Sequence, residues 1–147
     1  MFDEIDRDII NLLMEDSRIT NIEIAKKIKR SESTVRQRVT KLLDKGIIRK
    51  FSIVVDPAAL GYTTISYIGI NTHPAKLLKI IQSLKKIEEI VSIATTTGDY
   101  MIVCEIWTSK GDNLSEIVDQ IEAMEGILEV LPSIIQEKHK EYSINGK

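Results

Sequence analysis

The sequence predicts an α+β protein with two domains, a small helical domain followed by a larger domain of alternating strands and helices. Three observations lead to this fold class. Apolar residues recur at helical spacing through residues 3–45, a β-branched run follows, and after the pair Asp56-Pro57 the expected order is β-α-β-β-α-β. That order, with two halves of similar length, is the signature of a ferredoxin-like βαββαβ sandwich.

Three short helices are predicted in the first domain, over residues 3–15, over residues 21–28, and from residue 31 to just before Gly46. Each begins at a residue whose side chain can cap a helix, namely Asp3, Thr20 and Ser31. Gly46 stands where a left-handed C-terminal cap is needed. The apolar stripes are formed by Ile5, Ile9, Leu12 and Leu13, by Ile24, Ala25 and Ile28, and by Val35, Val39, Leu42 and Leu43.

The β-branched run that begins at Ile47 predicts a strand leaving the first domain. Proline and glycine in residues 56–61 mark a hinge. The expected organisation is therefore a helix-turn-helix domain with a following strand over residues 1–55, the hinge, and a second domain over residues 62–147.

The second domain is expected to contain four strands and two helices. The strands are predicted over residues 62–71, 90–97, 100–108 and 127–138. One helix opens at Pro74, and the other is striped by Leu114, Ile117, Val118 and Ile121 and closed by Gly126. Helices cover one face of such a sheet, so its second face is a candidate partner surface, and dimers are expected through this domain.

Charge is distributed unevenly along the chain, although the formal net charge is only −2. Residues 18–50 carry eleven basic and three acidic side chains, a local charge of +8, whereas the remaining residues carry nine basic and nineteen acidic ones. A basic block on an otherwise acidic protein is the electrostatic pattern of a nucleic-acid reader.

The third predicted helix carries a polar face that suits the recognition helix of a helix-turn-helix pair, which enters the major groove of DNA. Gln37 suits an adenine edge, and Arg36 or Arg38 suits guanine or a phosphate. The alternative is an ordinary solvated basic helix. The residues expected at the DNA interface are Lys26, Lys29, Arg30, Ser31, Ser33, Thr34, Arg36, Gln37, Arg38 and Lys41.

Several motifs together resemble the leucine-responsive and asparagine-regulator (Lrp/AsnC, feast/famine) family of transcription regulators. They are Asp-Glu-Ile-Asp at residues 3–6, Ile-Ala at 24–25, Ser-Glu-Ser-Thr-Val-Arg-Gln-Arg-Val at 31–39, Gly-Ile-Ile at 46–48 and Thr-Thr-Gly-Asp-Tyr at 96–100. The resemblance covers essentially the whole chain and identifies the first domain as a winged-type helix-turn-helix.

The resemblance implies a dimer, often assembled into tetramers or octamers, that binds pseudo-palindromic promoter DNA. It also implies an amino acid or related metabolite as effector, bound near Gly98, Asp99 and Tyr100, with Ser133 contributing across an interface. Met101 stands where many family members have an acidic residue. The alternative reading of Gly98-Asp99 is a hairpin turn without a ligand.

The sequence argues against an enzyme, because it contains no glycine-rich phosphate loop, no metal-ligand spacing and no convergent catalytic set. No cofactor, metal site or membrane span is expected, and the acidic N-terminus favours a cytoplasmic protein. Two alternative functions remain at this point. One is an architectural DNA-binding protein without ligand response, and the other is a metabolite-binding regulatory subunit that acts on a protein partner.

Overall fold

The computed structural model describes residues 2–109 and 111–141 and divides into two compact units. The first unit contains the helices up to Val54, and the second runs from Val55 to Lys138. Each unit has its own hydrophobic core. No helix among the described residues is sufficiently long and apolar to cross a membrane.

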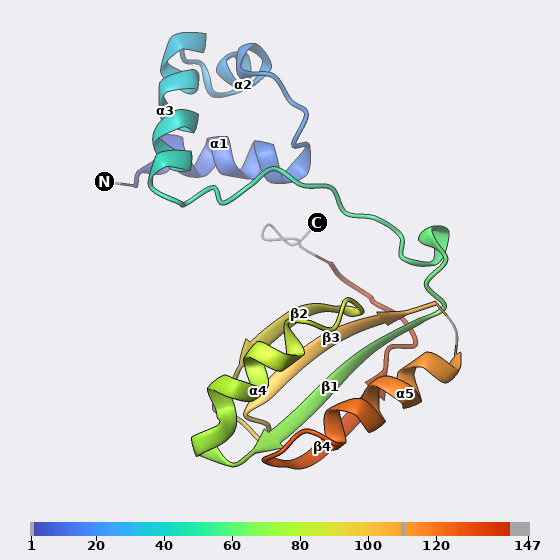
Figure 1. Cartoon of the computed structure of the whole chain (residues 1–147). Coiled ribbons are helices and arrows are strands. Elements are labelled where there is room, and N and C mark those ends of the chain that lie inside the picture. Colours follow the sequence, from blue (N-terminus) through green and yellow to red (C-terminus); the bar gives the residue numbers. More distant parts are fainter. Residues whose placement is uncertain (1, 110, 142–147) are drawn as a thin grey trace. The chain divides into compact units, whose positions relative to one another are not determined.

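The first unit contains three helices, α1 (Glu4–Glu15), α2 (Asn21–Ile28) and α3 (Glu32–Asp44), as predicted (Figure 1). The expected caps are confirmed, because the side chains of Asp3, Thr20 and Ser31 accept hydrogen bonds from the backbone amides of the first turns. Gly46 adopts the left-handed conformation with φ of 66°. The core between the helices consists of Ile9, Ile24, Ala25, Val35 and Leu42.

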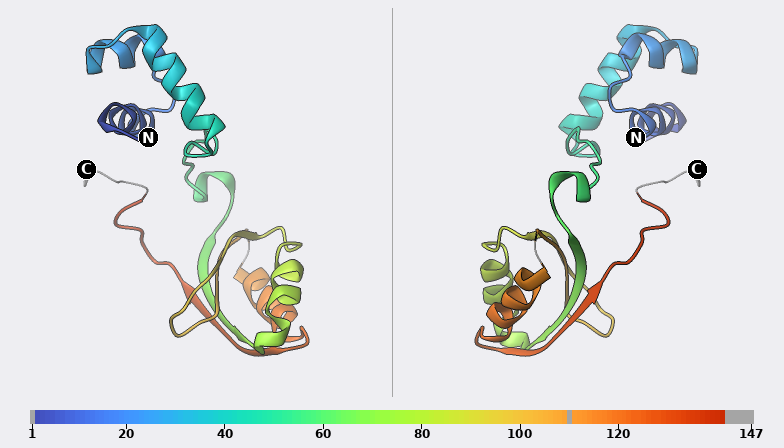
Figure 2. Two further views of the ribbon diagram at one scale, coloured as in Figure 1. Left: turned by 90° about the vertical axis from the view of Figure 1, so that its left-hand side faces the viewer. Right: turned by 90° about the vertical axis from the view of Figure 1, so that its right-hand side faces the viewer.

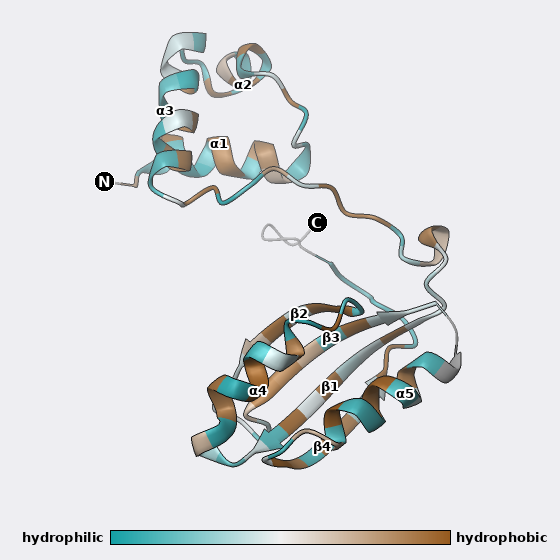
Figure 3. Cartoon of the chain, in the orientation of Figure 1, coloured by the Kyte–Doolittle hydropathy of each residue, from teal (hydrophilic) through white to brown (hydrophobic). Residues whose placement is uncertain are grey.

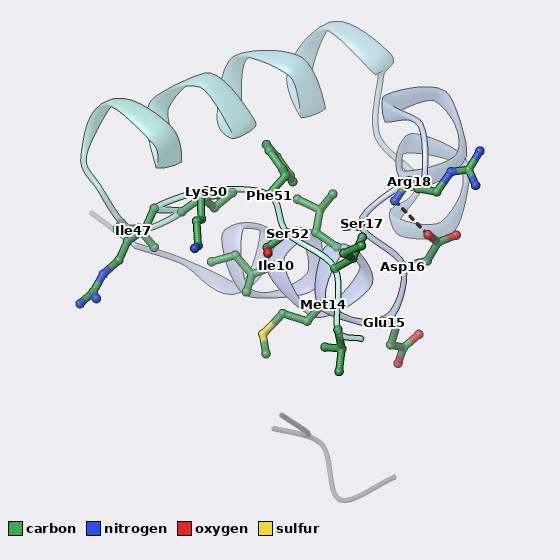
Figure 4. Close-up of a pocket in the computed structure, with 15 residues that line it drawn as sticks. Ile10, Met14, Glu15, Asp16, Ser17, Arg18, Ile47, Lys50, Phe51 and Ser52 are labelled. Atoms are coloured by element: carbon green, nitrogen blue, oxygen red, sulfur yellow. Dashed lines mark hydrogen bonds between the residues drawn. The ribbon is translucent and has the colours of Figure 1, made fainter. Parts of the chain in front are cut away.

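The strand predicted from Ile47 to Val55 is wrong, because this segment pairs with no other strand among the described residues. It runs extended from the end of α3 and, together with α1, lines a groove whose residues include Ile10, Met14 and Phe51 (Figure 4). Apolar side chains stay accessible, with Ile53 77% and Val54 66% exposed. The sequence has strand propensity here, but a strand requires a paired neighbour.

The second unit contains one antiparallel sheet in the order β2-β3-β1-β4, the order of a ferredoxin-like sandwich. The strands are β1 (Thr64–Thr72), β2 (Ile90–Thr95), β3 (Ile102–Thr108) and β4 (Ile127–Ile134). The 3-10 turn η1 (Ala58–Leu60) precedes the sheet, and a second one, η2 (Pro74–Lys76), begins at Pro74 and leads into helix α4 (Leu77–Leu84). Helix α5 (Gly111–Glu122) follows β3, and both helices lie on the same face of the sheet (Figures 1 and 2).

Strand ends differ from the prediction by a few residues. Strand β2 ends at Thr95, and β3 begins at Ile102, because the chain between them forms a turn. Strand β4 ends at Ile134, four residues earlier than expected. The ladder with β1 ends at the pair Ser66 and Ile134, and beyond it the Ile135 amide donates to the Ile65 carbonyl oxygen at 2.8 Å.

Successive side chains of each strand point to opposite faces of the sheet. Figure 3 shows the corresponding change of hydropathy along β1. The face toward the helices carries the fully buried side chains of Ile68, Ile70, Ile102, Cys104 and Ile106. Burial raises the pKa of the Cys104 thiol to about 11, as expected for a structural cysteine. No helix or strand of the described part of this unit covers the opposite face, which we call the open face, although Lys138 Nζ lies 3.2 Å from the Glu105 carboxylate on it. The open face carries Ile65, Tyr67, Gly69, Asn71, Val103, Glu105, Trp107, Glu129, Leu131 and Ser133.

Candidate nucleic-acid interface and ligand turn

Helix α3 presents a continuous exposed face to solvent. Its side chains recur at the spacing i, i+3, i+4, i+7 and i+8, which places them on one side of the helix. They are Ser33, Arg36, Gln37, Thr40 and Lys41, and we call them the exposed α3 face. Four of the five were predicted from the sequence, and Thr40 was missed because its hydroxyl also donates to the Arg36 carbonyl oxygen, a local role that gives no signal in sequence.

Arg36 is held only loosely on this face. Its guanidinium lies 3.7 Å from the Glu32 carboxylate, and the two side chains are 64% and 38% exposed. An exposed pair at i, i+4 contributes only about 0.3–0.5 kcal/mol. Arg36 can therefore exchange Glu32 for a phosphate or a base edge at little cost.

The hydroxyl groups at the start of α3 are mostly engaged with the helix itself. Ser31 Oγ accepts a hydrogen bond from the Thr34 amide at 3.2 Å and lies 2.7 Å from Thr34 Oγ1. Ser33 is exposed, and its Oγ lies 3.0 Å from Ser31 Oγ. All three hydroxyl groups are thus engaged at the start of α3, where Ser31 is the cap and Ser33 remains exposed.

Three further predicted DNA contacts flank the exposed α3 face. Lys26 on α2, and Lys29 and Arg30 in the turn between α2 and α3, are all exposed. Lys29 adopts the left-handed conformation with φ of 53°, which turns the chain so that α3 can begin three residues later. The basic side chains are therefore available to phosphates on either side of a groove.

Arg38 does not belong to the exposed face, although the sequence placed it among the DNA contacts. Its side chain is only 27% exposed and lies against the first turn of α1. The guanidinium donates to the Asp3 carboxylate and, at 3.0 Å, to that of Asp6. The hydrogen bond from Arg38 lowers the pKa of the Asp3 carboxyl group, and the bond to Asp3 raises the pKa of Arg38.

The predicted effector residues Gly98, Asp99 and Tyr100 lie together in the turn between β2 and β3. Asn71 on β1 holds this turn, because its Nδ2 donates to the Asp99 carbonyl oxygen at 3.0 Å and its Oδ1 accepts from the Met101 amide at 3.0 Å. Thr96 closes the turn by donating to the Tyr100 carbonyl oxygen. The turn is thus fixed to the sheet, while Asp99 remains exposed.

Tyr100 lies directly over Gly69 on the open face. A Cβ atom added at Gly69 would lie 2.5 Å from Tyr100 Cγ, so only glycine leaves room for the ring. Sequence reasoning missed this contact, because Gly69 lies in the middle of a predicted strand and gives no turn signal.

Ser133 does not lie beside the turn within one chain. It pairs with Tyr67, four residues along β1 from Asn71, which corresponds to a separation of about 13 Å. Glu129 is the β4 residue at that end, and its carboxylate accepts from Asn71 Nδ2 at 3.2 Å. Asn71 and Glu129 were not singled out from the sequence, since strand register is needed to place them there.

Three capped helices with an exposed basic face define a helix-turn-helix DNA-binding protein, and no metal-binding group of His, Cys, Asp or Glu occurs within the described residues. Residues 2–49 match the family description winged helix-turn-helix DNA-binding, and residues 65–144 match the Lrp/AsnC ligand binding domain. The chain belongs to the Lrp/AsnC family of helix-turn-helix transcriptional regulators.

Relatives and solved structures agree with this assignment. The chain is 39% identical to the transcriptional regulator LrpA of Pyrococcus horikoshii, over 95% of this chain and 100% of LrpA. It is 36% identical to the regulator FL11 of Pyrococcus furiosus, over 96% and 93% of the two chains. The E. coli AsnC structure superimposes with a TM-score of 0.88 at 28% identity, over 98% of both chains. A Neisseria meningitidis regulator solved as an L-Met complex has the same fold, with a TM-score of 0.87 at 22% identity over 96% and 94%.

Proposed function

We propose that this protein is a sequence-specific regulator that binds promoter DNA as a dimer, acts in the cytoplasm, and presents two copies of the exposed α3 face to successive major grooves. The observation that carries this proposal is the face itself, on which Arg36, Gln37 and Lys41 stand on one side of a well-capped helix. Arginine and glutamine are the residue types that read guanine and adenine edges. Two such helices read half-sites one helical turn, or a multiple, apart.

The open face supports dimerisation through the second unit. Tyr67 is 43% and Leu131 39% exposed near its centre, and Trp107 flanks them on β3. Exposed apolar side chains on a sheet face that no helix or strand of the described chain covers are typical of an interface. The extended segment 47–54 offers a second apolar surface that a partner copy would cover. Further assembly to tetramers or octamers is part of the proposal.

Selection of duplexes from a random 30-base-pair pool by the full-length protein tests DNA recognition. We expect a pseudo-palindromic sequence to be enriched and to bind, in fluorescence anisotropy, about 10³-fold or more tightly than a shuffled duplex at the same salt concentration. Equal binding to both duplexes with a steep salt slope would instead indicate an architectural DNA-binding protein. Absence of binding to either would favour a regulatory subunit that acts on a protein partner.

We propose further that an amino acid binds at the turn of residues 98–100 and changes the oligomeric state. The second unit matches a ligand-binding domain, and Asp99 offers an exposed carboxylate to an ammonium group. A ligand shifts assembly only if it binds one oligomer better than another. Sedimentation velocity with each of the twenty amino acids at millimolar concentration tests this, and an unchanged distribution with all of them would contradict it.

Gly69→Ala is expected to displace the Tyr100 ring, because the added Cβ would lie 2.5 Å from Tyr100 Cγ. Overpacking of this kind costs about 1–3 kcal/mol, measured as the change in the free energy of unfolding. The sedimentation response to the effector should weaken as well, because the turn that carries Asp99 loses its support.

Gly98→Ala is the matched control for this substitution. A Cβ at Gly98 meets nothing within 4 Å, and its φ does not require glycine. The control should unfold like the unchanged protein. Equal stability of both variants would show that the Tyr100 ring moves aside without cost.

A further inference from the structure

We propose that Arg38 is a positioning residue that fixes the rotation of α3 against α1 and does not itself contact DNA. This inference rests on DNA binding by the exposed α3 face. Asp3 and Asp6 at the start of α1 hold Arg38 in this position. These two carboxylates therefore favour DNA binding, although they are negatively charged.

Arg38 lies on the side of α3 that faces α1. It follows the buried Val35 by three residues and precedes the buried Leu42 by four, so all three side chains share one side of the helix. Gln37 and Lys41, by contrast, point to solvent. A side chain cannot both contact α1 in this way and reach a groove on the opposite side of α3.

The partners of Arg38 are themselves fixed. Asp3 and Asp6 form the capping box of α1, in which each side chain accepts from the backbone amide of the other. Asp6 is almost fully buried, with 6% of its side chain exposed. A buried carboxylate requires a partner, and the planar guanidinium can donate to two carboxylates at once. Arg38 thus connects α3 to the capping box of α1.

Apolar packing alone leaves the rotation of α3 less well defined. The core residues Ile9, Val35 and Leu42 hold the two helices together, but aliphatic contacts have no preferred direction. A rotation of 20° moves a side chain at the helix surface by about 2 Å. That displacement is larger than the tolerance of a hydrogen bond to a base edge.

Whether Asp3→Asn strengthens or weakens DNA binding distinguishes a positioning role of Arg38 from a direct DNA contact. Asparagine remains a good N-cap, so α1 still begins at the same residue, but the charge that holds Arg38 is lost. If Arg38 contacted phosphate, removing a nearby negative charge would release it and strengthen binding. If Arg38 positions α3, the same substitution weakens binding although it makes the protein less acidic.

The test is a double-mutant cycle of Asp3→Asn and Arg38→Gln, with affinity for the selected duplex measured by anisotropy over a salt series. The temperature is chosen so that circular dichroism shows every variant folded. We expect each single variant to bind about tenfold more weakly, the double variant to bind no more weakly than either, and Arg38→Lys to recover part of the loss. The salt slope should stay unchanged in all of them, since no phosphate contact is lost.

Two results would overturn the proposal. One is equal or tighter DNA binding by Asp3→Asn, and the other is a salt slope that falls by about one in Arg38→Gln, the mark of a lost phosphate contact. Amide chemical shifts of residues 33–41 test the position of α3 in the absence of DNA, because the Asp3→Asn substitution should change them. If selection enriches no duplex, the proposed DNA recognition is wrong. The positioning role is still tested in that case, because unchanged amide shifts of residues 33–41 in Asp3→Asn would disprove it.

Discussion

Replacing Leu131 with Asp on the open face is expected to convert the proposed dimer to monomers and to weaken binding to the selected two-half-site duplex by about 10²- to 10⁴-fold. Leu131 lies on β4 beside Gly69 of β1 and is 39% exposed within a single chain. In a face-to-face dimer it would be buried against the partner sheet. A carboxylate placed among the apolar side chains of this face would lose its hydration without gaining a partner.

The large loss in DNA binding follows from the geometry of two linked half-sites. In a dimer, binding of one α3 places the second close to its own half-site, so the second contact forms at a high effective concentration. A monomer retains the contacts of one helix only. Sedimentation velocity measures the assembly, and anisotropy on full-site and half-site duplexes measures the two affinities.

Leu78→Asp is the matched control, because Leu78 is 77% exposed on α4, on the helical side of the sheet. It should leave both assembly and affinity unchanged. A Leu131→Asp protein that still sediments as a dimer would show that the open face is not the interface. If the Leu131→Asp monomer binds the full-site duplex as tightly as the unchanged protein, dimerisation does not contribute to DNA affinity.

The helices and their caps could be predicted from the sequence because they depend on neighbouring residues. Asp3, Thr20 and Ser31 each bond to an amide three residues later, and Gly46 acts through its own φ. The segment after Ile47 was different. Its β-branched composition favours a strand, but a strand forms only where a partner strand is present. Among the described residues the chain supplies no partner for this segment.

The site was predictable to the extent that helical periodicity defines it. The spacing of apolar residues identified the polar side of α3, but Arg38 stands at its edge, and only the contact with Asp3 and Asp6 shows which way its long side chain turns. At the turn, Gly98-Asp99 was visible in the sequence. Asn71 and Glu129 were not, because their positions depend on the register between β1 and β4.

Arg36→Ala and Gln37→Ala are each expected to weaken binding to the selected duplex by about 5- to 150-fold, the effect of losing one good base contact. Both side chains are exposed on α3, and the Ala variants keep its caps and core intact. The two contacts should read different positions. Each variant should therefore lose discrimination at its own base pair when binding is measured on duplexes substituted one position at a time.

Arg7→Ala provides the control for charge, because Arg7 is exposed on α1 and its loss also removes one positive charge. We expect less than about a twofold change for this variant, since it removes a solvent-screened charge that lies outside the exposed α3 face. The comparison with shuffled duplex then decides the role of Arg36. If Arg36→Ala weakens the binding of all sequences equally and lowers the salt slope by about one, Arg36 contacts phosphate. If it weakens only the selected sequence, Arg36 reads a base, and the exposed α3 face is what gives this regulator its specificity.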